Sequence, residues 1–481
     1  MSIKKNALLR IRNYSVGIFA QIFTIFFLTT QLDILQFGVW GVANSFIFVL
    51  STIFQLSYCE DIEKYFPNLN NDLRQKTLVK YLKTVVLCLP FIVAILVLIN
   101  FTNYFRVLEL SNLYYLFLLI SFHAIIESLL AIFDSYYLSK NFSRYYDSAD
   151  LYIYKIPRLA IFVVLVIQGY SVYYLLFSSL ILRILLLVQL ILKEFKTFNT
   201  FLKLLLSVEI FKNNFINIKY TFQAFVNNIL YFSFLNLLFL ISINNLDSLD
   251  IAHFSLSILI INSLRPIFNS LPSILSPIIS KESFMNKNPI HLINASNKVN
   301  LLFISISLTA SIYIIENKLL INFFLKDYYV GIYKLIFLSI FASTLRSTYF
   351  NKYLKLLFKG LESKLLKFNL VLSLILLATF AIPYEFYKLN FLYFYMFYEL
   401  NLYFYINHLY NSEKSLFKEI FQDLNFSYIF ILLICIFYML NIYIIELLFL
   451  SLLIIFFDFL KTFKIFFQKK INLNNIWESL K

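Results

Sequence analysis

The sequence has few charged residues. Only 14% of its 481 residues are Asp, Glu, Lys or Arg, whereas 60% are hydrophobic and the mean hydropathy is +0.78. A soluble domain of this length needs a larger charged and polar surface. The composition therefore excludes a soluble globular protein and indicates that lipid surrounds most of the chain.

Cysteine and nucleotide-binding motifs are also scarce. The three cysteines, Cys59, Cys88 and Cys435, are odd in number and lie within or beside apolar segments, where cysteine usually packs as a small hydrophobic residue. We therefore expect no disulfide, no metal site and no cofactor. The sequence contains no G-x-x-x-x-G-K-[ST] loop for binding ATP. Any transport must then draw on an ion gradient, the membrane potential or the substrate gradient.

The sequence is instead rich in long apolar segments. About 17 mainly apolar residues suffice for a helix that crosses a membrane. The first segment follows a basic stretch but lacks a cleavage site, so we interpret it as a retained helix. The fourteen predicted spans are 14–31, 38–58, 83–99, 112–138, 156–169, 171–192, 220–243, 251–279, 298–315, 332–350, 364–382, 389–409, 427–440 and 443–461.

The distribution of Lys and Arg orients these spans. Of the 41 Lys and Arg residues, 33 lie in or beside the connections on one side, four lie on the other side, and four fall inside spans. Cytoplasmic connections accumulate positive charge, so both termini are predicted to lie in the cytoplasm of a multi-pass protein of the inner membrane. The same connections account for the net charge of +15, which needs no nucleic-acid partner.

The connections also indicate the organisation of the chain. We predict an all-α polytopic membrane protein with an N-terminal six-helix bundle at 1–192 and a cytoplasmic connection at 193–219. A second six-helix bundle follows at 220–410, and 411–481 holds two further helices and a basic tail. No connection approaches about 50 residues, so none has room for a soluble domain.

Acidic residues and one histidine lie inside two of the predicted spans. His123, Glu127 and Asp134 recur within about 40° of one another around one helix. A charged side chain near the bilayer centre costs roughly 2.5–3.5 kcal/mol, so these groups face a protein interior or a water-filled cavity. With Glu399 in the twelfth span, they are candidates for an ion relay or a cavity wall. The alternative is a buried polar seam with a structural role.

Arginines inside spans suggest a binding site for an anion. Arg265 lies near the middle of the eighth span and directly precedes Pro266, which can interrupt the helix where it lines a cavity. Together with Arg183 and Arg346, it would form a cationic cavity suited to phosphate. In the alternative interpretation, Arg183 and Arg346 form structural ion pairs with membrane carboxylates, for which the candidates are Glu127, Glu399 and Glu446.

Four short motifs carry a resemblance to a known family. After the basic N-terminus, Gln36-Phe37-Gly38-Val39-Trp40-Gly41 is similar to an E-F-G-x-Y turn, and Lys64-Tyr65-Phe66 to an R-Y-F motif. Ser276-Pro277-Ile278-Ile279-Ser280 is similar to P-x-x-S, and Leu325-Lys326-Asp327-Tyr328-Tyr329 to G-x-x-Y without the glycine. With these motifs the chain resembles the polysaccharide flippases (O-antigen, Wzx-type) of the multidrug/oligosaccharidyl-lipid/polysaccharide exporter superfamily.

The resemblance implies a fold and a function. The fold is two six-helix bundles with two trailing helices around a V-shaped cationic cavity, to which Arg265, Arg183 and Arg346 would contribute. The function is to move an undecaprenyl-pyrophosphate-linked oligosaccharide across the inner membrane for O-antigen or capsule biosynthesis. The partners implied are the lipid-linked oligosaccharide, membrane lipids, a polysaccharide polymerase and a chain-length regulator.

Two other functions remain open. A multidrug exporter of the same fold is the nearest, because a fold does not fix a function. A membrane-embedded enzyme, such as a polysaccharide polymerase or acyltransferase, is the other. The outward connections are short, and the four histidines show no paired arrangement: His123, His253, His291 and His408. We therefore expect a protein that is not an enzyme.

Overall fold

In the part of the chain that it describes, the computed structural model consists of helices joined by short connections and contains no strand. The described residues are 3–90, 113–140, 143–207, 218–243, 246–264, 346, 349–350, 352–353, 355–356, 361–379 and 390–410. Arg265, the two motifs at 276–280 and 325–329, and the predicted spans at 298–315, 427–440 and 443–461 lie outside these residues. The predicted all-α class is confirmed.

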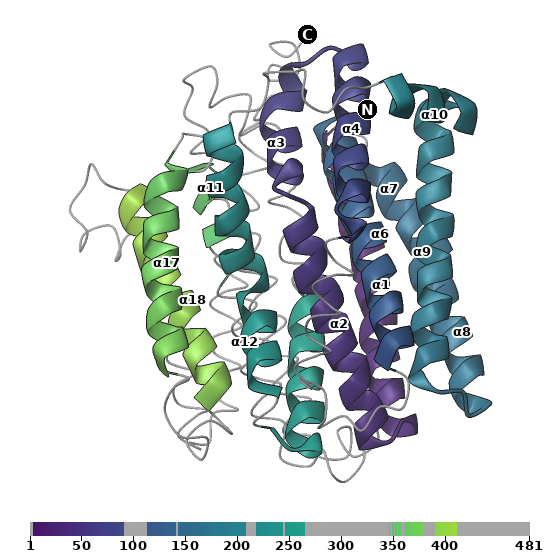
Figure 1. Ribbon diagram of the computed structural model, residues 1–481, viewed down its shortest axis with the longest axis vertical. Helices are drawn as coiled ribbons and strands as arrows, with labels where there is room; N and C mark the ends of the chain where they lie inside the picture. The colour runs from purple at the N-terminus through teal and green to yellow at the C-terminus, as the bar shows by residue number, and fades with distance from the viewer. Residues whose placement is uncertain are drawn as a thin grey trace, which may run out of the picture.

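The helices of the first half pack side by side with their axes roughly parallel (Figure 1). Local sequence sets where two of them begin: Asp33 Oδ1 accepts a hydrogen bond from Gln36 N at 2.6 Å, and Asn70 Oδ1 accepts one from Leu73 N at 3.0 Å. The elements are α1 (Ile3–Gln31), α2 (Ile34–Phe54), α3 (Tyr58–Tyr65), η1 (Phe66–Asn68), α4 (Asn71–Leu87), α6 (Leu113–Ser139), α7 (Ser143–Ala149), η3 (Asp150–Lys155), α8 (Ile156–Ile167), α9 (Val172–Phe195) and α10 (Phe198–Ser207).

The described helices of the second half lie on the other side of α2 and α3 (Figure 1). They are α11 (Ile218–Asn228), η4 (Ile229–Ser233), α12 (Phe234–Ser242), a helix at Ser248–Leu264, α17 (Glu362–Thr379) and α18 (Asn390–Tyr410). α11 packs against α17, and α12 packs against α2. The division into two six-helix bundles and a trailing pair of helices, with its limits, stays a prediction.

Several described helices are suited to a lipid environment. Three are long and apolar enough to cross a membrane: α2, residues Tyr115–Ser139 of α6, and α9. A fourth candidate is the bent pair Thr221–Tyr231 and Phe234–Ser242, whose two arms meet at 57°. Large apolar side chains on the outer face of α9 are exposed, as expected for contact with lipid rather than water; they are Phe177, Ile181, Ile184, Leu185 and Val188.

The fifth helix is longer than the predicted span 156–169. α7, η3 and α8 follow one another without a break from Ser143 to Ile167, and η3 is a six-residue π-helix. α1 likewise begins at Ile3, well before the predicted start of the first span at residue 14. These extensions matter because they place charged residues of the predicted cytoplasmic connections on helices that pack into the protein.

Two glycines of the Gln36–Gly41 motif allow the halves to pack closely. A Cβ atom on Gly41 would lie 3.0 Å from the Cα atom of Ser255, and one on Gly38 would lie 3.2 Å from Ile251 Cγ2. Such distances are closer than ordinary van der Waals contact, so a side chain at Gly41 would force the helices apart. The motif therefore serves the contact between α2 and the helix at Ser248–Leu264.

Candidate functional site

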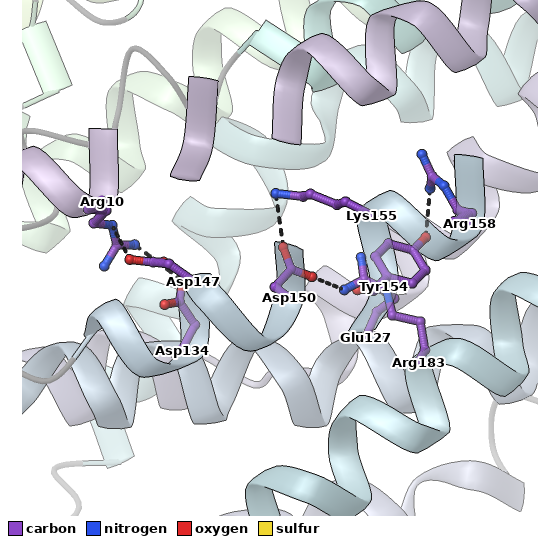
Figure 2. A network of polar contacts seen from close by, with 9 residues as sticks. All are labelled: Arg10, Glu127, Asp134, Asp147, Asp150, Tyr154, Lys155, Arg158 and Arg183. Carbon is purple, nitrogen blue, oxygen red and sulfur yellow. Dashed lines mark hydrogen bonds and ion pairs between the residues drawn. The ribbon is translucent and has the colours of Figure 1, made fainter. Parts of the chain in front are cut away.

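A network of buried ion pairs lies in the first half of the protein (Figure 2). At its centre, Arg183 of α9 contacts two carboxylates: its Nε lies 2.6 Å from Glu127 Oε1, and its Nη1 lies 3.0 Å from Asp150 Oδ1. The other oxygen of Asp150 lies 2.9 Å from Lys155 Nζ. Arg183 of α9 is thus joined to α6 by an ion pair and to η3 by a charge-assisted hydrogen bond.

Aromatic contacts hold the two arginines of this centre in place. The guanidinium carbon of Arg183 lies 3.5 Å from the centroid of the Tyr154 ring, within the range of a cation–π interaction. Arg158 Nη1 donates to the Tyr154 hydroxyl at 2.6 Å, and that hydroxyl lies 3.1 Å from Ser179 Oγ. In Figure 2, Tyr154 lies between Arg158 and Arg183. Tyr154 therefore orders both cations at once.

A second group of charges, which includes Arg10 of α1, belongs to the same buried polar region (Figure 2). Arg10 is only 2% exposed; its Nη2 lies 3.5 Å from Asp134 Oδ2, and its Nε lies 3.9 Å from Asp147 Oδ2. α1 also approaches η3, because a Cβ atom on Gly17 would lie 2.6 Å from Lys155 Cδ. The glycine leaves room for the lysine side chain to cross α1 and reach Asp150.

The network as drawn in Figure 2 carries no net formal charge, since its four acidic residues balance its four basic ones. The acidic residues are Glu127, Asp134, Asp147 and Asp150, and the basic ones are Arg10, Lys155, Arg158 and Arg183. Balanced charge is what burial at membrane depth requires, because an isolated ion there costs several kcal/mol. Several of these groups share a partner, so the loss of one charge changes the pairing of the others.

The sequence identified only part of this network. The sequence predicts Glu127, Asp134 and Arg183 as intramembrane charges, whereas it places the remaining members within or beside predicted cytoplasmic connections. A signal was present, because Asp150, Tyr154 and Arg158 recur every four residues and so share a helix face. The predicted fifth span, 156–169, excludes Asp150 and Tyr154, so this shared face is not apparent from the predicted spans. The π-helix that carries Asp150 and Lys155 is a feature often found at functional sites.

The structure divides the predicted stripe on α6 between two sets of partners. Glu127 pairs with Arg183 of α9, and Asp134 pairs with Arg10 of α1. His123 is buried at 3% exposure, and its Nδ1 has no hydrogen-bond partner in the described part of the chain. Whether these residues act as an ion relay stays a prediction.

A smaller buried ion pair lies in the second half. Arg346 and Glu399 are 1% and 0% exposed, and Nη1 lies 3.5 Å from Oε1. Arg346 also donates to the backbone carbonyl of Tyr231, and its guanidinium carbon lies 3.7 Å from the Tyr231 ring centroid. The Tyr349 hydroxyl donates to Glu399 Oε2. This is the pairing expected in the structural interpretation of Arg346, while a role for Arg346 and Arg183 in binding substrate stays a prediction.

The halves also meet at α3, in the predicted cytoplasmic connection. Asp61 is 1% exposed and accepts hydrogen bonds from Thr221 Oγ1 at 3.3 Å and from the Tyr81 hydroxyl at 3.5 Å. Asn228 Nδ2 donates to Ser57 Oγ at 3.3 Å. Burial raises the pKa of Asp61 to about 7, and the two hydrogen bonds to its carboxylate only partly oppose this effect.

No group of three or more His, Cys, Asp or Glu in the described ranges is arranged to hold a metal ion.

Comparison by sequence finds no matching family model and no significant match among curated proteins. Comparison by structure does find matches. The chain aligns with the MATE multidrug transporter DinF-BH, solved with a bound ligand, at a TM-score of 0.58 and 10% identity, covering 86% of this chain and 96% of the other.

The chain has the fold of the MATE transporters. An outward-facing MATE multidrug resistance transporter of the MOP superfamily matches at a TM-score of 0.59 and 12% identity, over 86% of this chain and 98% of the other. A MOP superfamily transporter from Pyrococcus furiosus, described as having a binding pocket of reverse polarity, matches at a TM-score of 0.55 and 13% identity. This match also covers 86% of this chain and 98% of the other.

These matches confirm a polytopic, all-α membrane fold like that of the MATE transporters. Identities this low show the fold alone. A multi-pass membrane location follows from the fold and the apolar helices, while the orientation of the termini stays a prediction. The flippase branch, with its lipopolysaccharide role, stays a prediction as well.

Proposed function

We propose that the chain is a secondary active exporter of amphipathic organic solutes, driven by a cation that binds at the Glu127–Asp150–Arg183 centre. The observation that carries the proposal is the contact of one buried arginine with two carboxylates from different helices, at 2.6 and 3.0 Å. In this proposal the centre has two arrangements, one with Arg183 paired to Glu127 and one with Arg183 paired to Asp150. The fold supports export, since solved structures that share it are multidrug transporters.

Coupling would follow from competition for Arg183. A proton or metal cation on Glu127 or Asp150 neutralises that carboxylate and weakens its ion pair, so the guanidinium shifts towards the other one. Because Glu127 belongs to α6 and Asp150 to η3, this shift favours a different packing of the two helices. A ligand drives such an equilibrium only through its different affinity for the two states. Each charge that crosses the membrane contributes about 2.3 kcal/mol per 100 mV.

The charge balance supports an amphipathic rather than a pyrophosphate-linked substrate. Arg183 and Arg346 are each paired with carboxylates, so within the described residues they add no excess positive charge to a cavity. A pyrophosphate brought to these arginines would have to displace the carboxylates and leave them buried without a partner, which costs several kcal/mol.

Dye efflux tests the proposal. In cells lacking their own exporters, the full chain should lower the accumulation of a fluorescent rhodamine dye, and dissipating the ion gradients should abolish this effect. Glu127→Gln and Asp150→Asn should each reduce the initial efflux rate by about tenfold or more, while membrane insertion is preserved because each change removes a charge from the membrane. Asp72→Asn, at an exposed position of α4, is the matched control. Wild-type efflux by both variants would refute coupling at this centre.

A lipid-linked oligosaccharide is the second candidate substrate, favoured by the motif resemblance and by the predicted pair of trailing helices. Restoration of surface polysaccharide in a strain lacking its own flippase would support it. Arg265→Ala should then lose most of this activity, whereas Arg265→Lys should retain part of it through its point charge. Complementation without any dye efflux would favour the flippase, and efflux without complementation would favour the exporter.

A further inference from the structure

A cavity of about 370 Å³ opens at one end of the first half, and none of its lining residues belongs to the ion-pair network of Figure 2. It is formed where the first turn of α4 meets the last turns of α6 and α9, at the end of the bundle where α10 lies (Figure 1). The residues that line it are Asn71, Arg74, Tyr137, Lys140, Lys193 and Glu194. This end carries the basic connections that the positive-inside rule assigns to the cytoplasm.

One oxygen of the single carboxylate in the cavity lining is already occupied by internal contacts. Glu194 Oε1 accepts hydrogen bonds from the Tyr136 hydroxyl, from Gln75 Nε2 at 2.9 Å and from Lys140 Nζ at 2.8 Å. Glu194 therefore neutralises one of the three cations and positions it. The lining keeps an excess of two positive charges, which fits an anionic ligand.

Two hydrogen-bond donors of the cavity are buried without a partner among the described residues. The Tyr137 side chain is 3% exposed and its hydroxyl makes no hydrogen bond, and neither does Nε of Arg74. Arg74 is held in place by a bond from Nη2 to the carbonyl of Pro67 at 3.2 Å, and Lys193 lies 5.2 Å from the Tyr145 ring centroid. Buried polar groups are normally paired, so these donors indicate a ligand rich in acceptor oxygens.

We propose that this cavity, the α4–α6–α9 pocket, binds a phosphate group. Arg74 presents the forked donors that suit phosphate, Lys193 adds a point charge, and the Tyr137 hydroxyl supplies a neutral donor. The phosphate belongs either to the headgroup of an anionic lipid in the adjoining leaflet or to a soluble phosphorylated solute. The pocket is separate from the proposed coupling centre, so the inference holds whichever solute the protein transports.

Lipid and phosphate titrations of the purified full chain test the proposal. After delipidation, phosphatidylglycerol, phosphatidylcholine and inorganic phosphate are titrated separately, and bound lipid is counted by native mass spectrometry while thermal stability is followed in parallel. The double variant Arg74→Gln/Lys193→Gln should weaken binding of the preferred ligand by about tenfold or more, because charge-assisted hydrogen bonds are lost. Tyr137→Phe, which removes only a hydroxyl, should weaken it a few-fold.

Lys76→Gln is the matched control, because Lys76 is an exposed cation on the same helix that does not line the pocket. A lipid headgroup is supported if the protein prefers phosphatidylglycerol to phosphatidylcholine, the double variant loses this preference and the control keeps it. A soluble phosphorylated solute is supported if inorganic phosphate raises the thermal stability of the wild type and the control but not of the double variant, and neither lipid is preferred. Equal affinity of the control and both pocket variants for every ligand would overturn the proposal. If Tyr137→Phe without ligand is as thermally stable as the wild type, misfolding is excluded as the cause of its weaker binding.

Discussion

The Arg346–Glu399 pair offers the sharpest test of whether membrane arginines are structural. Both side chains are inaccessible to solvent, and the described residues around them supply a carbonyl, a hydroxyl and an aromatic ring as further partners. If the pair is structural, removing either charge should destabilise the protein, and removing both should largely restore it. The variants are Arg346→Met, Glu399→Gln and the two combined.

The expected magnitudes follow from the burial of the pair. Breaking a buried ion pair by removing one partner costs about 3–5 kcal/mol, because an uncompensated charge is left behind. Arg346→Met should fall in this range, since Glu399 would keep, among the described residues, the Tyr349 hydroxyl as its one hydrogen-bond donor. Glu399→Gln should cost about the same, although the Tyr231 carbonyl and ring soften the loss for Arg346. The double variant replaces both charges and should lie within about 1 kcal/mol of the wild type.

A double-mutant cycle measures this coupling. Thermal unfolding of the four purified proteins in one detergent gives the order of stability, and the sum of the single effects is compared with the double variant. Transport by the double variant should be close to wild type if the pair is only structural. Additive losses of stability, or a stable double variant that no longer transports, would refute the structural role. Either result would favour a role for Arg346 in binding substrate.

Three further predictions address the contacts between the halves and the topology. Gly41→Val should slow transport about tenfold or more, because the added side chain cannot fit against Ser255, and cross-linking between α2 and the Ser248–Leu264 helix would report the lost contact. Since burial raises the pKa of Asp61 from 3.8 to about 7, the folded state binds the extra proton, so stability should fall as pH rises from about 4 to 7; Asp61→Asn should make that decline shallower in thermal unfolding. Reporter fusions should place 193–219 inside the cell and 244–250 outside, and an inside signal from 244–250 would break the predicted map.

The helices themselves could be predicted closely from the sequence. α2, α6 and α9 begin and end within four residues of the spans expected at 38–58, 112–138 and 171–192. Hydropathy succeeds here because a helix in lipid satisfies its own backbone hydrogen bonds, so the length of an apolar run by itself sets the length of the element. It fails where charged residues continue a helix, as in α1 and across η3, because the burial of those charges depends on partners from other helices.

The pairing of the charges is what only the tertiary structure decided. Composition and the placement of Lys and Arg determined that the chain lies in a membrane, that it is helical and that Glu127, Arg183, Arg346 and Glu399 are intramembrane charges. They left open whether each arginine faces a substrate cavity or a carboxylate. That choice depends on contacts between residues 50 or more positions apart, such as Arg183 with Glu127 and Glu399 with Arg346. Such contacts arise only when helices pack, since no local pattern in the sequence fixes which faces meet.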